Sequence, residues 1–251
     1  MEISCVIPAY ENLDLVARCL TSVLAQEHVA FEIVVSDDSA SEVVRDFVAT
    51  LTRPPPEVRY VAGPRSGNPV ANWNLGLAQA RGEFSVLVHH DEFLVDPRYF
   101  RRAVDALRAS GAAAVVGATT VVGITRESRF GLVSRIARLV GRPAWLLLVA
   151  NWLGPTAALV FRRGPLFDET LKGIVDVEFY RRVMAAGPLV FLPGVSVGSL
   201  GHHGAQITAG LDFKVVVANE LRDLAGRTPP SISPAEHAFC RAWLRMASWL
   251  R

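Results

Sequence analysis

The sequence predicts an α/β fold in which a mostly parallel, twisted sheet is flanked by helices within a single domain. Two observations predict it. Over the first half of the chain, short runs rich in β-branched residues alternate with segments of helical periodicity, the pattern of parallel βαβ units. Hydrophobic residues make up 51% of the 251 residues, which supplies a large core and argues against disorder.

The first half of the chain supplies the clearest elements. Ile3 to Ile7 forms a strand that Pro8 stops, and Leu13 to Gln26 has the apolar spacing of a helix. Ser41 is placed to cap the second helix. The other elements expected up to residue 120 are strands at 31–36, 58–62, 84–88 and within 111–122, and helices at about 42–51 and 70–80.

The second half is less regular. Residues 144–161 carry no charge and are long enough for a marginal membrane span, but Asn151 and Gly154-Pro155-Thr156 interrupt them. We therefore expect a buried helix followed by a strand, with a helix on a membrane surface as a further option because arginines lie beside it. The remaining expected elements are a basic amphipathic helix at 128–140, helices at 176–186, 213–224 and 235–250, and a strand at 190–197.

Composition limits the classes of function. The formal net charge of +2 implies no general attraction to nucleic acid, so no nucleic-acid partner is expected. Cys5, Cys19 and Cys240 lack metal-site spacing and are expected to be buried free thiols in a reducing compartment. The N-terminus lacks the basic and apolar regions of a signal peptide, so a cytoplasmic location is expected.

The segment from Phe84 to Phe93 carries the strongest functional signal. Its apolar run ends in His89, His90, Asp91 and Glu92. Open α/β sheets bind ligands beyond the carboxyl ends of their strands, and carboxylates are the donors that Mg²⁺ and Mn²⁺ prefer. Taken alone, a turn with solvated polar residues explains the segment about equally well.

A series of motifs along the chain, from about residue 3 to 210, resembles family 2 glycosyltransferases. No single motif is decisive, but their common order is specific. The motifs are Val6-Ile-Pro-Ala-Tyr-Glu-Asn12, Glu32-Ile-Val-Val-Ser-Asp-Asp-Ser39, Asn72-Trp-Asn-Leu-Gly-Leu-Ala78, His89-His-Asp-Glu92, Gly154-Pro-Thr-Ala157, Phe161-Arg-Arg163, Phe167-Asp-Glu169, Val175-Asp176 and His203-Gly-Ala-Gln206-Ile-Thr208.

The resemblance implies a GT-A fold with a nucleotide-binding half at about 1–97, an acceptor-binding half at about 98–210 and closing helices at 211–251. The donor expected from the resemblance is a nucleotide sugar, with UDP as the expected nucleotide, held with Mn²⁺ or Mg²⁺. The residues implied to contact the nucleotide are Pro8, Ala9, Tyr10, Asp38, Asn72 and His90, with the Asp38 carboxylate accepting from a uracil N–H. A turn or capping role suits Asp37 better than Asp38.

The resemblance also implies a metal ligand, Asp91, with His89, Glu92 and His203 around it. The sequence departs from the family here, because His89 replaces the first Asp of the Asp-x-Asp motif and Glu92 replaces the Asp that follows Asp91. A neutral imidazole suits Mn²⁺ better than Mg²⁺. His89 contacting the ribose or a phosphate, and His203 lying in a plain surface loop, are the open alternatives.

Asp176 is the implied general base of an inverting transfer, in which one carboxylate takes the proton of the acceptor hydroxyl. The Glu that usually precedes it is Val175 in this chain. An Asp at this position also suits a helix N-cap, and Arg181 and Arg182 after it suit either a phosphate contact or a solvated helix face.

Three interpretations compete: the transferase, a degenerate relative that binds a nucleotide or glycan without catalysis, and a metal-dependent phosphoesterase built on the His-His-Asp-Glu cluster. The acceptor side is expected at 128–153, whose apolar and basic character suggests a glycan or lipid-linked acceptor and peripheral contact with the inner face of a membrane. The basic, aromatic segment 241–251 fits the same contact or a packed closing helix.

Overall fold

The computed structural model describes residues 1–51, 56–122, 137, 139–200, 212–228 and 231–249. They form two compact units. The first comprises Met1–Thr125, Leu153–Phe167 and Arg182–Gly201 and holds the sheet, and the second comprises Arg126–Trp152, Asp168–Arg181 and His202–Arg251 and is helical in its described part.

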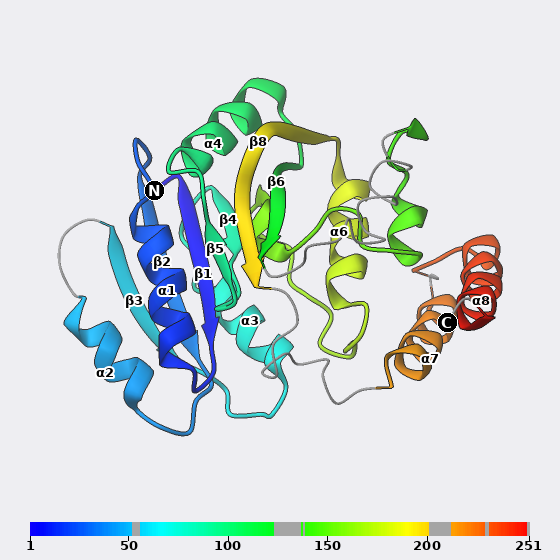
Figure 1. Cartoon of the computed structure of the whole chain (residues 1–251), viewed down its shortest axis with the longest axis horizontal. Helices are drawn as coiled ribbons and strands as arrows, with labels where there is room; N and C mark the ends of the chain where they lie inside the picture. Colours follow the sequence, from blue (N-terminus) through cyan, green and yellow to red (C-terminus); the bar gives the residue numbers. More distant parts are fainter. Residues whose placement is uncertain (52–55, 123–136, 138, 201–211, 229–230, 250–251) are drawn as a thin grey trace. The chain divides into compact units, whose positions relative to one another are not determined.

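The first unit is built on an eight-stranded sheet of order β3-β2-β1-β4-β7-β6-β8-β5 (Figure 1). Strands β1 to β4 are parallel to one another, whereas β7 runs antiparallel to both β4 and β6. The predicted parallel α/β sheet is therefore confirmed for the first four strands, and the sheet as a whole is mixed. The strands are β1 (Ile3–Ala9), β2 (Phe31–Asp37), β3 (Glu57–Ala62), β4 (Phe84–Leu87), β5 (Glu92–Leu94), β6 (Ala114–Val122), β7 (Leu159–Arg162) and β8 (Leu189–Leu200).

Helices cover both faces of the parallel strands. The helices α1 (Leu13–Leu24), α2 (Val43–Thr50) and α4 (Tyr99–Ser110) pack on the odd-numbered residues of β1 and β2 in one continuous apolar core. Helix α3 (Pro69–Ala78) lies on the even-numbered face, where a Cβ at Gly76 would be 2.5 Å from Val6 Cγ1. The strand order reverses between β3 and β4, and a right-handed crossover in the reversed direction places its helix on the opposite face of the sheet, as found for α3.

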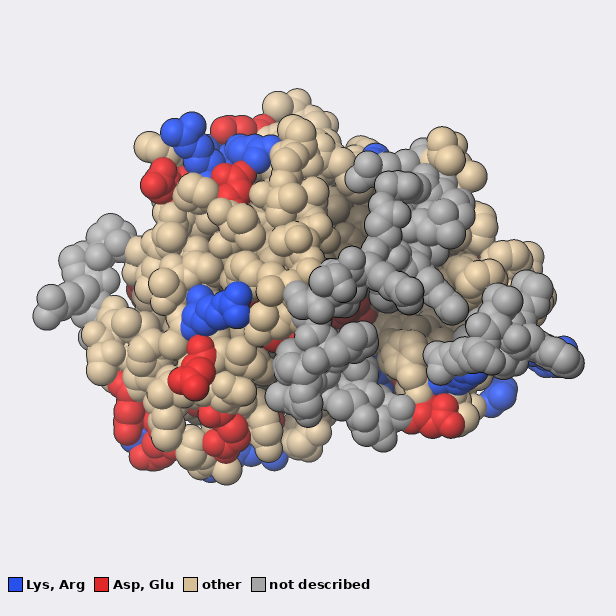
Figure 2. Space-filling model, viewed as in Figure 1, with Lys and Arg blue, Asp and Glu red and all other residues tan. Residues whose placement is uncertain are grey.

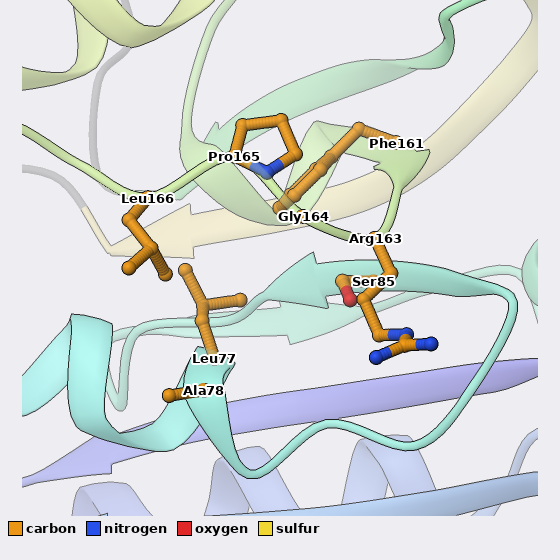
Figure 3. Close-up of a pocket in the computed structure, with 8 residues that line it drawn as sticks. All are labelled: Leu77, Ala78, Ser85, Phe161, Arg163, Gly164, Pro165 and Leu166. Atoms are coloured by element: carbon orange, nitrogen blue, oxygen red, sulfur yellow. The ribbon is translucent and has the colours of Figure 1, made fainter.

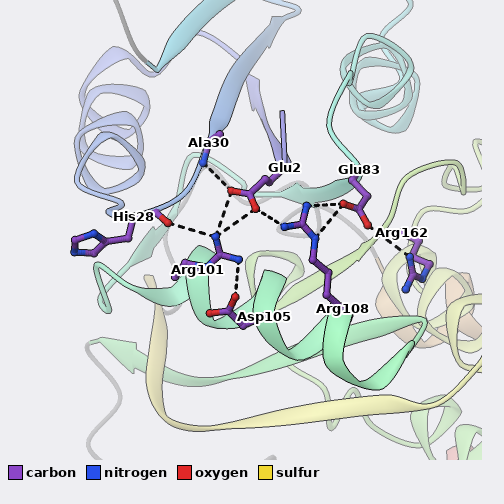
Figure 4. Close-up of polar contacts among 8 residues, drawn as sticks. All are labelled: Glu2, His28, Ala30, Glu83, Arg101, Asp105, Arg108 and Arg162. Carbon is purple, nitrogen blue, oxygen red and sulfur yellow. Dashed lines mark hydrogen bonds and ion pairs between the residues drawn. The ribbon is translucent and has the colours of Figure 1, made fainter.

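A charged cluster joins α4 to the amino ends of β1 and β4 (Figure 4). Arg108 bonds Glu2 Oε1 at 2.6 Å and Glu83 Oε2 at 2.7 Å, and Arg101 contacts Glu2 Oε1 at 3.3 Å. Burial raises the pKa of Glu2, but the N–H of Ala30 and the two arginines outweigh that effect and hold it below its usual value. The cluster is a structural tie at the end of the sheet opposite to the loops that follow β1, β2 and β4.

The second unit contains the 3₁₀ turn η1 (Ala144–Leu148), the first turns of α6 (Val175–Ala186), and helices α7 (Phe213–Gly226) and α8 (Pro234–Trp249). Asp212 caps α7 by accepting the N–H of Val215 at 3.3 Å. Ser233 and Glu236 cap α8 reciprocally, each accepting the backbone N–H of the other. None of the helices in the described ranges is long and apolar enough to cross a membrane.

The structure corrects two local predictions. Ser41 does not cap α2, because Glu42 is the N-cap residue and makes no capping bond, while the Ser41 hydroxyl bonds Glu11. Residues 144–161 form η1, a second 3₁₀ turn η2 (Thr156–Ala158) and the start of β7, so the expected strand is confirmed and the expected helix is only a short turn. Most of the helix expected at 128–140 lies outside the described residues.

The other predicted elements that fall on described residues agree with the structure within a few residues, whereas strand β5 and helix α4 were not predicted. Cys5, Cys19 and Cys240 are free and buried, as expected, and burial raises the pKa of each thiol. On the face drawn in Figure 2, Lys and Arg side chains lie among Asp and Glu rather than apart from them. This mixture is what a formal charge of +2 leads one to expect.

Candidate functional site

The carboxyl ends of β1 and β2 are joined by Glu11, the second residue after β1. Its carboxylate accepts the N–H of Ala40 at 2.7 Å and the N–H and hydroxyl of Ser41 at 3.2 and 2.7 Å, and its own N–H donates to Ser39 Oγ at 2.6 Å. The Ser41 hydroxyl and these N–H groups hold the pKa of Glu11 below its usual value. Glu11 therefore fixes the two loops of the site against each other.

The two aspartates that end β2 have different environments. Asp37 is 3% exposed and accepts hydrogen bonds from the Ser39 N–H at 3.1 Å and the Tyr60 hydroxyl at 3.1 Å. Burial, with the Asp37 charge next, raises the pKa of Tyr60 to about 12. Asp38 is only half-buried, and its Oδ1 accepts the N–H of Arg65 at 2.5 Å. The structure thus makes Asp37 a turn residue and leaves Asp38 nearer to solvent.

Gly63 allows the loop after β3 to pass close to these aspartates. A Cβ at Gly63 would lie 2.6 Å from the carbonyl oxygen of Asp37 and 2.7 Å from Cα of Asp38. Real Cβ atoms do not approach so closely, so the position needs glycine for the close approach of two backbone segments.

The residues expected at the nucleotide differ in exposure. Tyr10, at the end of β1, is 61% exposed, whereas Ala9 is 1% exposed and Pro8 is buried. Asn72 is 3% exposed, and its amide donates to the Ser36 carbonyl at 2.8 Å and the Ala9 carbonyl at 3.4 Å. This arrangement favours a supporting role for Asn72 over direct contact with a ligand.

The turn after β4 carries His89, His90 and Asp91, all half-buried. The His89 ring packs edge-on against Trp73, with the ring centroids 4.5 Å apart. Burial lowers the pKa of His89 to about 4, although the neighbouring Asp91 acts in the opposite direction. His89 is therefore a neutral imidazole near neutral pH, which can donate through one ring nitrogen and accept or ligate through the other.

Glu92 faces the interior and holds the turn in place. It is 5% exposed, and its Oε2 accepts the N–H of His89 at 3.0 Å, the N–H of Ala157 at 3.1 Å and the hydroxyl of Thr156 at 3.2 Å. Although Glu92 was expected near a metal, its oxygen joins the β4–β5 turn to η2, and a supporting role follows from this geometry.

The donor set of this turn fits a divalent cation that shares its shell with a substrate. Among the residues that the structure describes, no three His, Cys, Asp or Glu side chains come together as a preformed metal site. Mg²⁺ and its relatives are commonly held by one or two carboxylates together with substrate phosphates and water. Asp91, with the neutral imidazole of His89 beside it, matches that kind of site. His203, the third expected ligand, lies outside the described residues, as does His202.

Asp176 lies in the first turn of α6 and is half-buried. It is inside the helix rather than at its N-cap, because the backbone carbonyl of Ile174 already accepts the first helical bond, from Glu178, at 2.9 Å. The arginines that follow it have protein partners. Arg181 bonds Glu236 of α8 at 2.8 Å, and Arg182 donates to a backbone carbonyl at 2.7 Å.

A separate cavity of about 170 Å³ lies beside the amino end of β4 (Figure 3). Its walls include Leu77 at the end of α3, Phe161 of β7 and Pro165 in the loop after β7, with Ser85 of β4 at its base. Because Ser85 is only the second residue of β4, the cavity is at the opposite end of this strand from His89. It is therefore distinct from the loops described above.

Sequence comparison identifies relatives of this chain. The family described as "Glycosyl transferase family 2" matches residues 4–147. The chain is 33% identical over 209 residues to an uncharacterized protein of Mycobacterium tuberculosis, covering 76% of this chain and 64% of the relative. It is also 33% identical over 139 residues to the succinoglycan biosynthesis protein ExoO of Rhizobium meliloti, covering 55% of this chain and 39% of the relative. The chain thus spans less than two thirds of the length of either relative.

Two solved structures have a similar fold. The structure of Staphylococcus aureus TarS 1–349 in complex with UDP-GlcNAc matches with a TM-score of 0.68 at 18% identity, covering 94% of this chain and 69% of that one. The mannosyltransferase PcManGT from Pyrobaculum calidifontis, in complex with GDP-Man and Mn²⁺, matches with a TM-score of 0.64 at 16% identity, covering 98% and 70%.

Proposed function

The chain belongs to glycosyl transferase family 2, and on that premise we propose that it is an inverting transferase that moves a sugar from a UDP-linked donor to an acceptor hydroxyl. The observation that carries the proposal is the partly exposed group formed by Tyr10, Asp38, His89 and Asp91. These residues follow β1, β2 and β4, which are adjacent parallel strands of one sheet. Ligands of open α/β sheets bind at this edge.

The donor's base and ribose are assigned to the loops after β1 and β2. The exposed Tyr10 ring stacks on the base, and the Asp38 carboxylate accepts the N–H of uracil, with Glu11 and Asn72 fixing the backbone around them. His90 completes this side from the turn after β4. A carboxylate oxygen can only accept hydrogen bonds, which fits the single imide N–H of uracil. Guanine also presents N–H donors, so the comparison of UDP with GDP below tests the choice of base.

The donor's diphosphate is assigned to Asp91 and His89. Asp91 would hold a Mn²⁺ or Mg²⁺ ion, which would supply positive charge to offset the charge on the leaving diphosphate. His89 would contribute a neutral nitrogen, a ligand that suits Mn²⁺ better than Mg²⁺. Glu92 keeps the turn in shape, and His203 is proposed as a further ligand.

Asp176 is proposed as the general base. It takes the proton of the acceptor hydroxyl while the oxygen attacks the anomeric carbon from the face opposite to the diphosphate, which inverts the configuration. One carboxylate is enough, because the metal rather than a protein acid would stabilise the leaving diphosphate.

The acceptor is proposed to be a glycan or a lipid-linked glycan. The name of the relative ExoO refers to the biosynthesis of succinoglycan, a polysaccharide, and supports that class. The apolar segment that contains η1 is the proposed acceptor side, and peripheral contact with a membrane is proposed for the same reason. Family membership does not favour the alternatives of a nucleotide binder without catalysis or a phosphoesterase.

The proposal is tested by calorimetric titration of the protein with UDP and with GDP, each with Mn²⁺ and with EDTA, followed by a transfer assay over nucleotide sugars and acceptors. We expect UDP to bind with Mn²⁺ and more weakly with EDTA, and one UDP-sugar to be consumed only when an acceptor is present. Preference for GDP would overturn the assignment of Asp38 to uracil. Absence of turnover from a folded, UDP-binding protein would overturn the transferase proposal.

A further inference from the structure

Helix α7 supplies a carboxylate to the backbone just before α6. Glu220 is 8% exposed, and its two oxygens accept the N–H groups of three successive residues: Lys172 at 2.5 Å, Gly173 at 3.1 Å and Ile174 at 3.0 Å. Successive N–H groups that converge in this way form a concave anion-binding site. In this protein the anion is a side chain of the same chain, so the site is a structural tie.

A second tie from α7 holds the beginning of the same segment. Arg227 is the C-cap residue of α7, seven residues after Glu220. It bonds Asp168 Oδ2 at 2.5 Å and Thr170 Oγ1 at 3.0 Å. Burial raises the pKa of Asp168, but Thr170 and Arg227 outweigh that effect and hold it below its usual value. Residues 168–174 are therefore fixed to α7 at both ends.

The fit around Glu220 leaves little freedom. A Cβ at Gly173 would lie 3.3 Å from Glu220 Oε2 and 3.1 and 3.2 Å from methyl groups of Val216 and Val217. These distances are tighter than ordinary contacts, so a side chain at residue 173 would displace the Glu220 carboxylate or the valine methyl groups by a few tenths of an ångström.

Ile174 is two residues before Asp176, and its carbonyl accepts the first hydrogen bond of α6. We propose that Glu220 is a positioning residue for Asp176: its carboxylate fixes the start of α6 and thereby the direction in which the Asp176 carboxylate points. This inference rests on the proposed function, in which Asp176 is the general base. Loss of the carboxylate frees three N–H groups, and the first turn of α6 then frays, which moves the base away from its proton.

The tie itself is tested by hydrogen–deuterium exchange in Glu220→Gln, with Glu27→Gln as the matched control. Glu27 is a solvent-exposed glutamate in the first unit whose side chain is 54% exposed. We expect the amides of residues 172–176 to exchange at least about tenfold faster in Glu220→Gln than in wild type and at the wild-type rate in Glu27→Gln. Unchanged exchange in Glu220→Gln would overturn the proposal before any assay of activity.

The role in catalysis is tested by steady-state kinetics on the donor and acceptor found in the transfer assay. Because a small displacement of a catalytic group costs up to about a hundredfold, Glu220→Gln should lower kcat by about ten- to a hundredfold while leaving the UDP dissociation constant unchanged. The loss should vanish in an Asp176→Asn background, since a residue that acts only through the base has nothing left to position.

The outcomes distinguish a failure of Asp176 as the general base from a failure of Glu220 as its positioning residue. If Asp176→Asn leaves kcat unchanged, the base assignment fails and the positioning role fails with it. If Asp176→Asn abolishes turnover while Glu220→Gln stays within about twofold of wild type, only the positioning role is overturned. Should Glu220→Gln not fold, Gly173→Ala keeps the charge but crowds the tie, and it should give the same loss of kcat at unchanged UDP affinity; wild-type kcat in this variant would overturn the positioning role.

Discussion

Asn72 and Ser36 exchange two hydrogen bonds that attach helix α3 to the end of strand β2. The Asn72 amide donates to the Ser36 carbonyl at 2.8 Å, and the Ser36 hydroxyl donates to Asn72 Oδ1 at 2.5 Å. Both residues are buried, so neither group has water as an alternative partner. The backbone that leads into Asp37 and Asp38 is therefore fixed by a side chain of helix α3, which lies 36 residues further along the chain.

Replacing Asn72 by alanine tests this support. The Ser36 hydroxyl keeps the backbone carbonyl of residue 72 as a partner, but the buried carbonyls of Ser36 and Ala9 lose the amide donor. Asn72→Ala should therefore lower the free energy of unfolding by about 1–3 kcal/mol. Urea unfolding followed by circular dichroism measures the change. Asn219→Ala, which removes an exposed amide from α7, is the control and should change stability by less than about 0.5 kcal/mol. An Asn72→Ala protein of wild-type stability would contradict a supporting role.

Tyr10→Ala should affect binding without affecting the fold. The ring is 61% exposed, so the free energy of unfolding should change by less than about 0.5 kcal/mol. Stacking of an aromatic ring on a base contributes about 1–3 kcal/mol, so UDP should bind at least about fivefold more weakly. Calorimetry with UDP and with pyrophosphate, both with Mn²⁺, separates base from phosphate contact. Equal weakening for both ligands would argue against stacking.

Asp91→Asn should remove the metal dependence of UDP binding. The amide keeps the size of the carboxylate but lacks the charge that attracts a divalent cation. We expect titrations of the variant with Mn²⁺ and with EDTA to give the same UDP affinity, and turnover to fall at least about a hundredfold. Asp105→Asn, at a side chain that is 66% exposed on α4, is the matched control. Retained Mn²⁺ dependence in Asp91→Asn would place the cation elsewhere.

Gly63→Ala should destabilise the first unit. The new Cβ would meet the Asp37 carbonyl oxygen at 2.6 Å, and relief of that overlap requires the backbone of one loop to shift. Overpacking of this kind costs about 1–3 kcal/mol. Gly226→Ala is the matched control, because nothing lies within 4 Å of its Cβ position, and it should be neutral or slightly stabilising. Equal stability of the two variants, measured by urea unfolding, would contradict the close approach at Gly63.

Glu32 should make stability depend on pH in the acid range. Burial raises the pKa of this carboxylate, but the Ser4 hydroxyl, the Arg81 N–H and the Arg59 guanidinium outweigh that effect and hold it below 4.5. The folded protein then binds the proton less readily than the unfolded chain, so the stabilisation is complete above the unfolded pKa and is lost as the pH falls. The free energy of unfolding of Glu32→Gln should therefore fall less steeply than that of wild type between about pH 5 and pH 3. Parallel curves would contradict this assignment.

Local sequence patterns predicted most of the first unit correctly. β-Branched runs and helical spacing place β1 to β4 and α1 to α3 within a few residues. Strands β1, β2 and β4 are buried along their whole length and so form continuous apolar runs, and α1 and α2 each have one apolar side. Helix α4 was not predicted, although it too has an apolar side. The pattern did not predict that β7 would run antiparallel between β4 and β6. The direction of a strand depends on the path by which the chain returns to the sheet, and the residues of the strand itself do not determine that path.

The sequence motifs predicted which residues belong to the site, but they did not predict which residues hold it in place, such as Glu11 and Glu220. Glu11 was noticed only as part of a motif, and Glu220 was not noticed, because its partners Lys172 to Ile174 are far away in the sequence. A glutamate on a helix carries no local signal that it will bind a distant loop. The two units also interleave along the chain, so composition shows no boundary between them.

The antiparallel pairing of β5 with β8 determines when the turn that carries Asp91 can take its final form. Glu92 pairs with Ser199, and the carbonyl of Asp91 accepts the N–H of Leu200 at 3.0 Å. During synthesis or refolding, β1 to β4 have all their parallel neighbours long before β8 is available, and such long-range pairing is slow to form. The nucleotide side can thus assemble first, and recovery of activity should follow the arrival of β8 rather than the folding of the strands that precede Asp91.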